Sequence, residues 1–299
     1  MPKADLHLHS NRSDGVLSPY EVVTQAAKRK LAAIALTDHD TVEGIPEALR
    51  AGEELGVRVV PGIEINTSSD NGELHILGYY IDHTDVGLIN SLKELKGARM
   101  HRILAIIEKL NGLGLDITKE QVLSRAGKAD TMGRPHVARV LIDKGFVSSI
   151  KEAFERYIGH GRPAYVERCK LMPREAIELI KGCGGVPVLA HPGILSSVSF
   201  IDLCIAKGIQ GIEAFHSRHD ENQATAFTEL ARRHNLIVTG GSDCHGVSKH
   251  DGDLLIGRFT VDIRAVDRLK ETADRNKQEL KREKHFRRGK NDGYNHKKS

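Results

Sequence analysis

Short apolar runs of four to eight residues recur along the chain and alternate with helical patterns. Continuous apolar runs of this length are typical of strands buried on both faces, as in a parallel sheet. The helical patterns carry start and stop signals, such as Ser18 followed by Pro19 at one start and Gly56 at one end. This alternation predicts an α/β fold with a mainly parallel sheet, either closed into a barrel or left open. The predicted strands cover residues 4–10, 31–37, 57–65, 73–81, 186–191, 211–216, 236–243 and 254–261.

One region breaks the alternation. Residues 85–170 show only helical patterns, the longest of them over residues 88–114. A segment of this size can form a small domain. We therefore expect an α/β unit made of residues 1–84 and 171–282 with a helical insertion at residues 85–170.

The C-terminal segment is strongly basic. Residues 281–299 contain eight Lys or Arg and two acidic residues, a net charge of +6, whereas the whole chain carries +4. Basic, polar segments of this kind are usually disordered, so we expect a disordered tail at residues 283–299. The tail could improve solubility or attract nucleic acid weakly.

Side chains that can bind metal ions stand at the ends of most predicted strands. Because the carboxyl ends of parallel strands converge on one mouth, we expect these side chains to lie together there. They are His7, His9, Asp38, His39, Glu64, His75, His191, Glu213, His216, Asp243 and His245.

The pair His7 and His9 is the most specific of these signals. Residues two apart in a strand point to the same side, and neutral imidazole is a favoured ligand for zinc, iron and copper. A carboxylate such as Glu64 can bridge two cations, which together can hold a hydroxide and a phosphoryl group. Nitrogen and oxygen ligands without thiolate suit Mn, Zn or Fe(II). A lone histidine at a strand end, such as His75, could instead be structural.

Positive side chains for a phosphate group occur in three places. The segment GRPH holds Arg134 and His136 beside a glycine and a proline that restrain the backbone, and we prefer it as a phosphate site. Residues 159–165 and the pair Arg218 and His219 are the other candidates. Each of these cations could also be an ordinary surface residue.

Composition excludes several classes of protein. Hydrophobic residues make up 39% and charged residues 28%, as in globular proteins, and no apolar run approaches the ~18 residues of a membrane span. The first residues lack the apolar core of a signal peptide, which favours the cytoplasm. Tryptophan is absent and aromatic residues are 4%, so stacking platforms for bases should be scarce. Nothing in the sequence indicates an obligate protein partner.

The cysteines carry no chemical signature. None of them forms a CxxC pair, so a structural zinc site or a disulfide framework is not expected. They are Cys169, Cys183, Cys204 and Cys244, and we interpret them as buried or incidental thiols.

Six motifs together resemble the PHP family, the polymerase and histidinol phosphatase family of metal-dependent phosphoesterases. The motifs are D-L-H-L-H-S (5–10), S-D-G (13–15), L-T-D-H-D (36–40), G-I-E (62–64), A-H-P-G (190–193) and S-D-C-H (242–245). The resemblance covers both ends of the chain in order and implies a distorted (β/α)7 barrel with a helical insertion. It also implies two or three divalent metal ions of the Mn, Zn or Fe type.

The resemblance assigns metal ligands residue by residue. His7, His9, Glu64 and Asp243 would bind a first metal ion. Glu64 would bridge to a second ion bound by His75 and His191. Asp14, His39 and His245 would bind a third, and Asp38 would orient the ligands.

The helical insertion with its R-P-H motif narrows the resemblance to a subgroup of 3′,5′-nucleoside bisphosphate phosphatases and 5′-to-3′ exoribonucleases. It implies that Arg134 binds a substrate phosphate. We therefore expect a phosphatase that removes the 3′-phosphate of nucleoside 3′,5′-bisphosphates, such as adenosine 3′,5′-bisphosphate, by attack of a metal-bound hydroxide. Arg134, His136 and Arg218 would bind the substrate, and His191, His216 or His219 would protonate the leaving oxygen.

Three alternatives stay open. The same site could serve a 5′-to-3′ exoribonuclease acting on short 5′-phosphorylated RNA. A histidinol phosphatase is disfavoured by the helical insertion. A PHP module that binds nucleic acid without catalysis is disfavoured because all the ligand motifs are present.

Overall fold

The computed structural model describes residues 1–69, 72–126, 133–167, 171–195, 197, 199–246 and 252–295. Cys169 lies outside these residues, and the other three cysteines are free and buried. Among the described residues, no helix is both long and apolar enough to cross a membrane.

Eight strands form one mixed sheet in the order β7-β6-β5-β4-β3-β2-β1-β8. The strands are β1 (Lys3–Leu8), β2 (Ala33–Leu36), β3 (Arg58–Ser69), β4 (Gly72–Tyr79), β5 (Val186–Leu189), β6 (Gly211–His216), β7 (Ile237–Gly241) and β8 (Val261–Asp262). Neighbours pair in parallel except at β4, which is antiparallel to β3 and β5, and at β8, which is antiparallel to β1. The expected α/β architecture is confirmed.

The sheet curls until β7 meets β1 at the mouth. The backbone N–H of Asp243 donates to the carbonyl of His7 (2.9 Å), and that of His9 donates to the carbonyl of Cys244 (3.2 Å). Gly241 permits this approach, because a Cβ there would lie 2.3 Å from the backbone nitrogen of His7. Seven strands thus form the barrel-like body, and the two-residue β8 is added at the start of β1.

The predicted strand at residues 254–261 is wrong over nearly all its length, since only Val261 belongs to β8. Gly257 adopts a left-handed conformation (φ 79°), and its N–H donates to the buried carboxylate of Asp5 (2.8 Å). Because of this turn, Leu254, Leu255 and Ile256 pack on the barrel although the segment does not form a strand.

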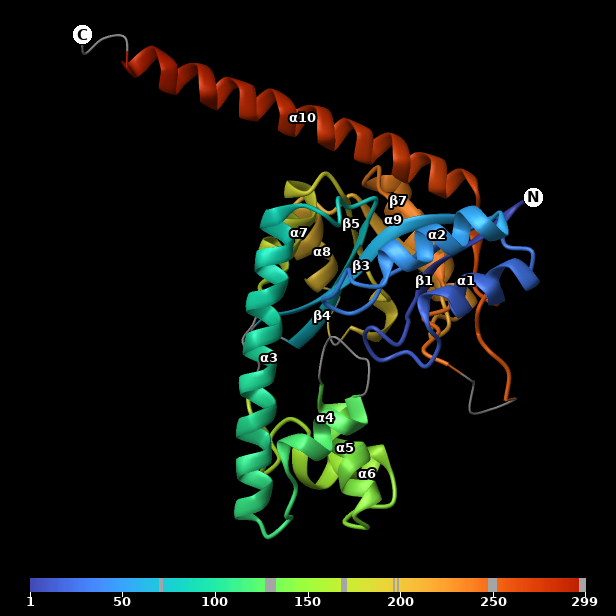
Figure 1. The fold of residues 1–299 in the computed structure, drawn as a ribbon. Helices are drawn as coiled ribbons and strands as arrows, with labels where there is room; N and C mark the ends of the chain where they lie inside the picture. The colour runs from blue at the N-terminus through green and yellow to red at the C-terminus, as the bar shows by residue number, and fades with distance from the viewer. Residues whose placement is uncertain are drawn as a thin grey trace.

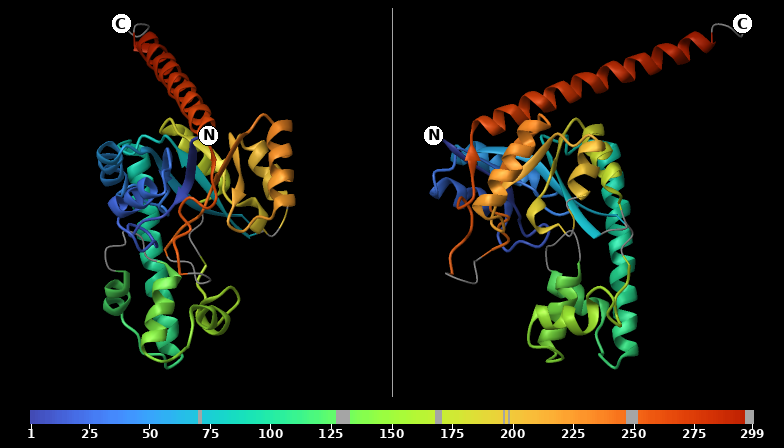
Figure 2. Two further views of the ribbon diagram at one scale, coloured as in Figure 1. Left: turned by 90° about the vertical axis from the view of Figure 1, so that its right-hand side faces the viewer. Right: turned by 180° about the vertical axis from the view of Figure 1, so that it is seen from behind.

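Some helices cover the outside of the sheet, and others form the insertion or cross one end of the barrel (Figures 1 and 2). In chain order, the helices are α1 (Pro19–Lys28), α2 (Ile45–Leu55), α3 (Val86–Gly112), α4 (Lys119–Ala126), α5 (Arg134–Asp143), α6 (Ile150–Ala153), the π-helix η1 (Phe154–Ile158), α7 (Pro173–Gly182), the 3-10 helix η2 (Pro192–Ile194), α8 (Ser199–Ala206), α9 (Glu221–Arg233) and α10 (Arg264–Asn295). Both predicted end signals are confirmed. Ser18 caps α1 in a capping box with Glu21, and Gly56 ends α2 in a left-handed conformation.

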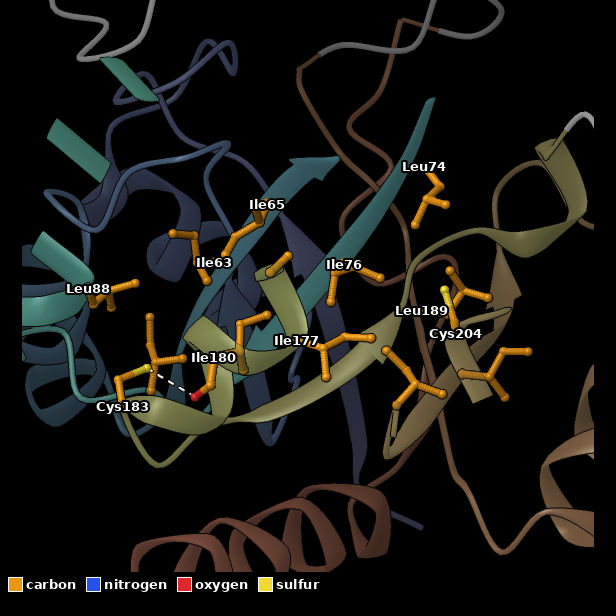
Figure 3. Packing of buried hydrophobic residues seen from close by; sticks show 14 of the residues in the cluster. Ile63, Ile65, Leu74, Ile76, Leu88, Ile177, Ile180, Cys183, Leu189 and Cys204 are labelled. Carbon is orange, nitrogen blue, oxygen red and sulfur yellow. Dashed lines mark hydrogen bonds between the residues drawn. The ribbon is translucent and has the colours of Figure 1, made fainter. Parts of the chain in front are cut away.

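The largest apolar cluster joins the sheet to its covering helices. Ile63, Ile65 and Ile76 from β3 and β4 pack against Ile177 and Ile180 of α7 (Figure 3). The β-branched side chains suit the pleated surface of a strand, and their burial is the main driving force for this layer.

The insertion has a hydrophobic cluster of its own, made by α3, α4, α5, α6 and η1 together with Ile117, Val147 and Ala164. Helix α3 belongs to both parts. Leu88 and Leu92 near its start pack in the barrel cluster, whereas Ile103, Ile106 and Leu110 pack in the insertion. The 27-residue helix therefore positions the insertion at one end of the barrel (Figure 1). The separate clusters support the division predicted for residues 1–84, 85–170 and 171–282, which stays a prediction.

Helix α10 crosses the opposite end of the barrel and extends beyond it (Figures 1 and 2). Val266, Leu269 and Ala273 of its first turns pack against the strand starts, and Asn276 donates to the carbonyl of Gly185 (2.7 Å). The structure differs from the predicted disorder over residues 283–295, whose backbone continues this helix. The docked first turns supply the nucleus, and the Lys, Glu and Arg residues that follow are good helix formers. Residues 296–299 lie outside the described residues.

Closure of the sheet at Gly241 can be tested by adding one methyl group. We expect Gly241→Ala to lower the free energy of unfolding by about 3 kcal/mol, the upper end for overpacking, because the clash is with strand backbone. Urea denaturation followed by circular dichroism measures this change.

Gly97→Ala is the matched control. Gly97 lies in α3 with nothing within 4 Å of an added Cβ, so alanine should stabilise the helix by roughly 0.5–1 kcal/mol. Equal stability of the two variants would contradict the close contact between β7 and β1.

Candidate active site

The mouth of the barrel collects seven imidazoles and four carboxylates. All nine residues predicted as metal ligands lie in this cluster, together with Glu213 and His216. The cluster consists of His7, His9, Asp14, His39, Glu64, His75, His191, Glu213, His216, Asp243 and His245.

The antiparallel direction of β4 explains the place of His75. In the sequence, His75 stands near the start of its strand, whereas the other predicted ligands stand at strand ends. Because β4 runs against β3, with Asn66 opposite His75, the start of β4 lies at the same mouth as the end of β3. His75 therefore faces Glu64, with 2.7 Å between Nδ1 and Oε1.

Glu64 is the centre of the cluster. Its side chain is 1% exposed, and its two oxygens face different histidines. Oε1 lies near His75 and His191 (2.7 and 3.0 Å). Oε2 lies near His7, His9 and His39 (3.1, 3.2 and 3.2 Å). A carboxylate placed in this way can bridge two cations.

Among the described residues, the side chains form four overlapping groups, and three of them are made up of predicted metal ligands. His7, His9, Glu64 and Asp243 bring their ligand atoms within 4.8 Å of one another, which is the first set that the resemblance implied. His9, Asp14, His39 and His245 form a second group. His39, Glu64 and His75 form a third, so His39 faces two groups where the resemblance gave it one. His191 contacts the third group through Glu64.

The electrostatics of the cluster favour bound positive charge. Burial would raise the pKa of Glu64, but His39, His7 and His75 hold it well below its ordinary value. Burial would lower the pKa of His9, yet its contacts with Asp243 and Glu64 raise it to about 10. The carboxylates therefore stay ionised and attract a cation, which can be a proton on imidazole or a metal ion.

Unsatisfied ring nitrogens show that the residues fit metal ions. Within the described part of the chain, both ring nitrogens of His9 and Nδ1 of His191 are buried without a hydrogen-bond partner. His9 Nε2 nevertheless lies 3.1 Å from Asp243 Oδ1. Buried polar atoms normally find partners, so ring nitrogens left unpaired among converging ligand atoms indicate a shared cation. The imidazole and carboxylate donors suit divalent ions such as Mn, Zn or Fe.

Glu213 supports two of these histidines, and the sequence analysis did not assign it a role. Its Oε1 lies 3.0 Å from His7 Nδ1, and its Oε2 accepts the backbone N–H of His191 (2.8 Å). His191 has a strained left-handed backbone (φ 27°), which such a contact helps to hold. The signal was its place in GIEAFH, a strand segment that also carries His216. Carboxylates that orient ligating histidines commonly tune metal affinity.

Asp38 holds the loop that follows β1. Its carboxylate accepts hydrogen bonds from the Ser10 backbone and hydroxyl (2.7 and 2.6 Å) and from the Ser13 hydroxyl (2.7 Å). This loop carries Asp14, so Asp38 orients a ligand through the backbone. The arrangement supports the orienting role expected for Asp38.

His216 and His219 differ in their surroundings. His216 lies with His7 and Glu213, and its Nε2 is 3.3 Å from Asp243. His219 has both ring nitrogens engaged by backbone, Nε2 with the N–H of Gly193 (3.0 Å) and Nδ1 with the carbonyl of Ala214 (2.9 Å). His219 therefore positions the loop after β5, and the structure disfavours it as a proton donor.

A pocket of about 200 Å³ lies between the metal-binding cluster and the insertion. His39 and His75 border it on the barrel side. Arg99 and Arg102 from α3 and Arg134 from α5 border it on the other. Three guanidinium groups beside a metal centre form a site for an anionic group.

The arginines are held in place by contacts within the protein, Arg99 by the carboxylate of Asp40 and Arg134 in part by Glu73 (3.7 Å). Arg134 lies over the ring of Phe154 (5.1 Å) and donates to the carbonyl of Ile158 (3.3 Å). Arg102 donates from Nε to the carbonyl of Val166 (2.8 Å), but its Nη2 is buried without a partner among the described residues. Burial, and then the charge of Arg134, lower the pKa of Arg102. A bound anion would stabilise the charged form of Arg102 and so offset both the burial and the repulsion from Arg134.

The three residues predicted to bind substrate are divided between two places. Arg134 and His136 line this pocket, and His136 Nδ1 accepts the N–H of Gly133 (3.1 Å) at the start of α5. Arg218 is exposed on the other side of the cluster, after β6, where its N–H donates to His216. Arg99 and Arg102 were missed by the sequence analysis. Their only signal was a spacing of three within a long helix, which places them on one face.

Comparison with known proteins identifies the family. The model of the PHP domain family matches residues 5–158, about half of the chain. The chain belongs to the PHP family. A 3′,5′-nucleoside bisphosphate phosphatase of Chromobacterium violaceum is 33% identical over 260 residues, which cover 85% of this chain and 91% of the relative. The 5′-3′ exoribonuclease Rnm of Escherichia coli is 32% identical over 250 residues, 81% of this chain and 84% of the relative.

Solved structures agree with this assignment. A Bifidobacterium adolescentis protein described as a metal-dependent phosphoesterase superposes with a TM-score of 0.80 at 32% identity, covering 90% of this chain and 96% of the other. Together with the mouth cluster, these similarities show that this PHP protein is a hydrolase, a metal-dependent phosphoesterase.

The central role of Glu64 can be tested by removing its charge. We expect Glu64→Gln to weaken Mn²⁺ binding by more than the ~10- to 100-fold that the loss of a ligand-supporting contact costs, because the amide carries no charge and cannot bridge two ions. Metal content after gel filtration, measured by inductively coupled plasma mass spectrometry, checks this.

Glu178→Gln is the control, since Glu178 pairs with Arg174 (2.7 Å) at the surface. It should keep the metal content of the wild type. If the Glu64 variant also keeps it, Glu64 is not the bridging ligand.

Proposed function

We propose that this phosphoesterase removes the 3′-phosphate of nucleoside 3′,5′-bisphosphates, such as adenosine 3′,5′-bisphosphate. The observation that carries the proposal is the arginine pocket directly beside the metal-binding cluster, with His39 and His75 as shared walls. The enzyme has two adjacent places for phosphate, and this substrate has two phosphates. The bisphosphate phosphatase from C. violaceum supports the choice.

The residues divide the work between the two phosphates. Arg99, Arg102 and Arg134 bind the 5′-phosphate, so that binding energy from this remote group positions the reacting one. The mouth cluster would hold two or three divalent ions of the Mn, Zn or Fe type, and these ions would supply an activated water and neutralise charge on the 3′-phosphoryl group.

Proton transfer falls to His191 or His216. His191 Nε2 contacts Glu64, and His216 Nε2 contacts Asp243, so both rings lie within the cluster at the reacting phosphate. When the bond between phosphorus and the 3′-oxygen breaks, that oxygen needs a proton. We prefer these two residues to His219 because the nitrogens of His219 are engaged by backbone.

A 5′-to-3′ exoribonuclease is the second candidate. A 5′-phosphorylated RNA presents the same two phosphates, and hydrolysis again breaks a bond between phosphorus and a 3′-oxygen. The exoribonuclease from E. coli supports this reading. Histidinol phosphate has one phosphate and would leave the arginine pocket without a partner. Nucleotide and RNA substrates favour the cytoplasmic location predicted from the sequence.

The substrate class is tested by comparing the turnover of three compounds. We expect purified protein with Mn²⁺ to release phosphate from adenosine 3′,5′-bisphosphate and adenosine 5′-monophosphate from a 5′-phosphorylated RNA 5-mer. Histidinol phosphate should react poorly because it cannot occupy both phosphate places. Phosphate is measured by molybdate assay and nucleotides by chromatography. No turnover of either nucleotide substrate contradicts the proposal.

The role of the arginines is tested by deleting a charge from the enzyme and a phosphate from the substrate. We expect Arg134→Ala to lower kcat/KM for adenosine 3′,5′-bisphosphate by about 10- to 100-fold, as for loss of a charge-assisted hydrogen bond. Activity on adenosine 3′-monophosphate, which lacks the 5′-phosphate, should change far less. Steady-state kinetics with both substrates measures the difference.

Arg125→Ala is the control from the same insertion, because Arg125 pairs with Asp143 at the surface. Metal content should be normal in both variants. An equal loss with both substrates would mean that Arg134 does not bind the 5′-phosphate.

A further inference from the structure

A second cavity, of about 570 Å³, lies beside the barrel mouth between α9 and the segment before β8. We name it the phenylalanine cavity, because Phe215 and Phe259 line it together with Ala224, Thr225 and Thr228. His216 and His219 form its boundary with the mouth. The proposed bisphosphatase reaction does not use this cavity.

A row of imidazole rings connects the two cavities across the cluster. The rings of His75 and His191 are 5.0 Å apart between centroids, those of His191 and His216 are 5.3 Å apart, and those of His216 and His219 are 5.2 Å apart. His75 lines the arginine pocket, and His216 and His219 line the phenylalanine cavity. The metal-binding cluster therefore lies between the two cavities.

The backbone of β6 is shaped to present Phe215 outward. The pairing of β6 with β7 shifts register between Glu213 and Phe215, which breaks the ordinary alternation of side chains. Glu213 and His216 are both buried at the mouth, whereas Phe215 is 39% exposed. Gly240 opposite makes room, since a Cβ there would lie 2.6 Å from the Cβ of Phe215. An apolar ring held exposed beside a metal site indicates a binding surface.

The chemistry of the cavity suits a nucleobase and not a phosphate. Two phenyl rings offer stacking surfaces, which are scarce in a chain with 4% aromatic residues and no tryptophan. Asp220, Glu221 and Glu229 also line the cavity. Their carboxylates repel a phosphate but can accept hydrogen bonds from the amino groups of a base.

We propose that the phenylalanine cavity binds the second nucleoside of a 5′-phosphorylated oligoribonucleotide. The inference rests on the proposed function and extends it to RNA ends. The first phosphate occupies the arginine pocket, the phosphodiester occupies the metal-binding cluster, and the next base lies against Phe215 and Phe259. Water adds its oxygen to phosphorus, the bond from phosphorus to the first 3′-oxygen breaks, and that oxygen takes a proton. The second nucleoside stays on phosphorus and leaves with a 5′-phosphate.

The test varies the second base. Wild-type kcat/KM is measured for the dinucleotide pApA and for the same compound with an abasic second ribose, with adenosine 3′,5′-bisphosphate as reference. We expect the base to raise kcat/KM by about 5- to 100-fold, the range for stacking of a base on an aromatic side chain. Phe215→Ala and Phe259→Ala should each bring the ratio of kcat/KM for pApA to kcat/KM for the abasic compound toward one.

Tyr20→Ala is the matched control, because Tyr20 on α1 is also 39% exposed but lies outside both cavities. It should keep the wild-type ratio. Binding without turnover gives a second readout. With EDTA present, 2-aminopurine in the second position should lose fluorescence when it stacks in wild-type protein, and this quenching should be weaker in Phe215→Ala.

The outcomes separate the two proposals. If the wild type hydrolyses the bisphosphate but treats the abasic and intact dinucleotides alike, the phenylalanine cavity does not bind the base. Retention of the wild-type ratio in both phenylalanine variants has the same meaning. The comparison of substrates in wild-type protein stands even if a variant fails to fold. If the wild type hydrolyses neither nucleotide, the proposed function itself fails, and the inference fails with it.

Discussion

The buried carboxylate of Glu64 is the constraint on which the site depends. An ionised carboxylate that is 1% exposed is stable only when positive charge or hydrogen bonds surround it, and five imidazoles do so here. These imidazoles come from four strands and the turns that follow them. The ends of β1, β2 and β5 and the start of the antiparallel β4 must therefore meet at one mouth, and the contact of β7 with β1 brings Asp243 to the same point.

In the proposed mode of binding, the site would gain selectivity for its substrate from the pockets on its two sides. Helix α3 packs on the barrel at one end and in the insertion at the other, so Arg99 and Arg102 are held at a set distance from the mouth. The opposite side opens between α9 and the segment before β8, where Phe215 is exposed. A charged pocket and an aromatic cavity on opposite sides of one metal-binding cluster suit a substrate in which phosphates and bases alternate.

Sequence patterns predicted most strands, the caps of α1 and α2, and eight of the nine metal-ligand candidates, because these depend on local periodicity and on strand ends, whereas Asp14 was predicted from the resemblance to the PHP family. The patterns failed where tertiary contacts override local preference. Residues 254–261 were predicted to form a strand, but they turn at Gly257, whose N–H donates a hydrogen bond to Asp5. The tail was expected to be disordered, yet docking of the first turns of α10 starts a helix that continues to Asn295. Arg99 and Arg102 carried no motif at all.

The sequence by itself determined the chemistry at the mouth. The pair His7 and His9, with Glu64 and Asp243 at other strand ends, already required a metal-binding cluster, since strand periodicity and parallel pairing bring such residues together. Only the tertiary structure decided how these ligands are grouped and which arginines face them. That depends on the antiparallel direction of β4, the register shift in β6 and the packing of α3, which are set by contacts between residues far apart in the chain.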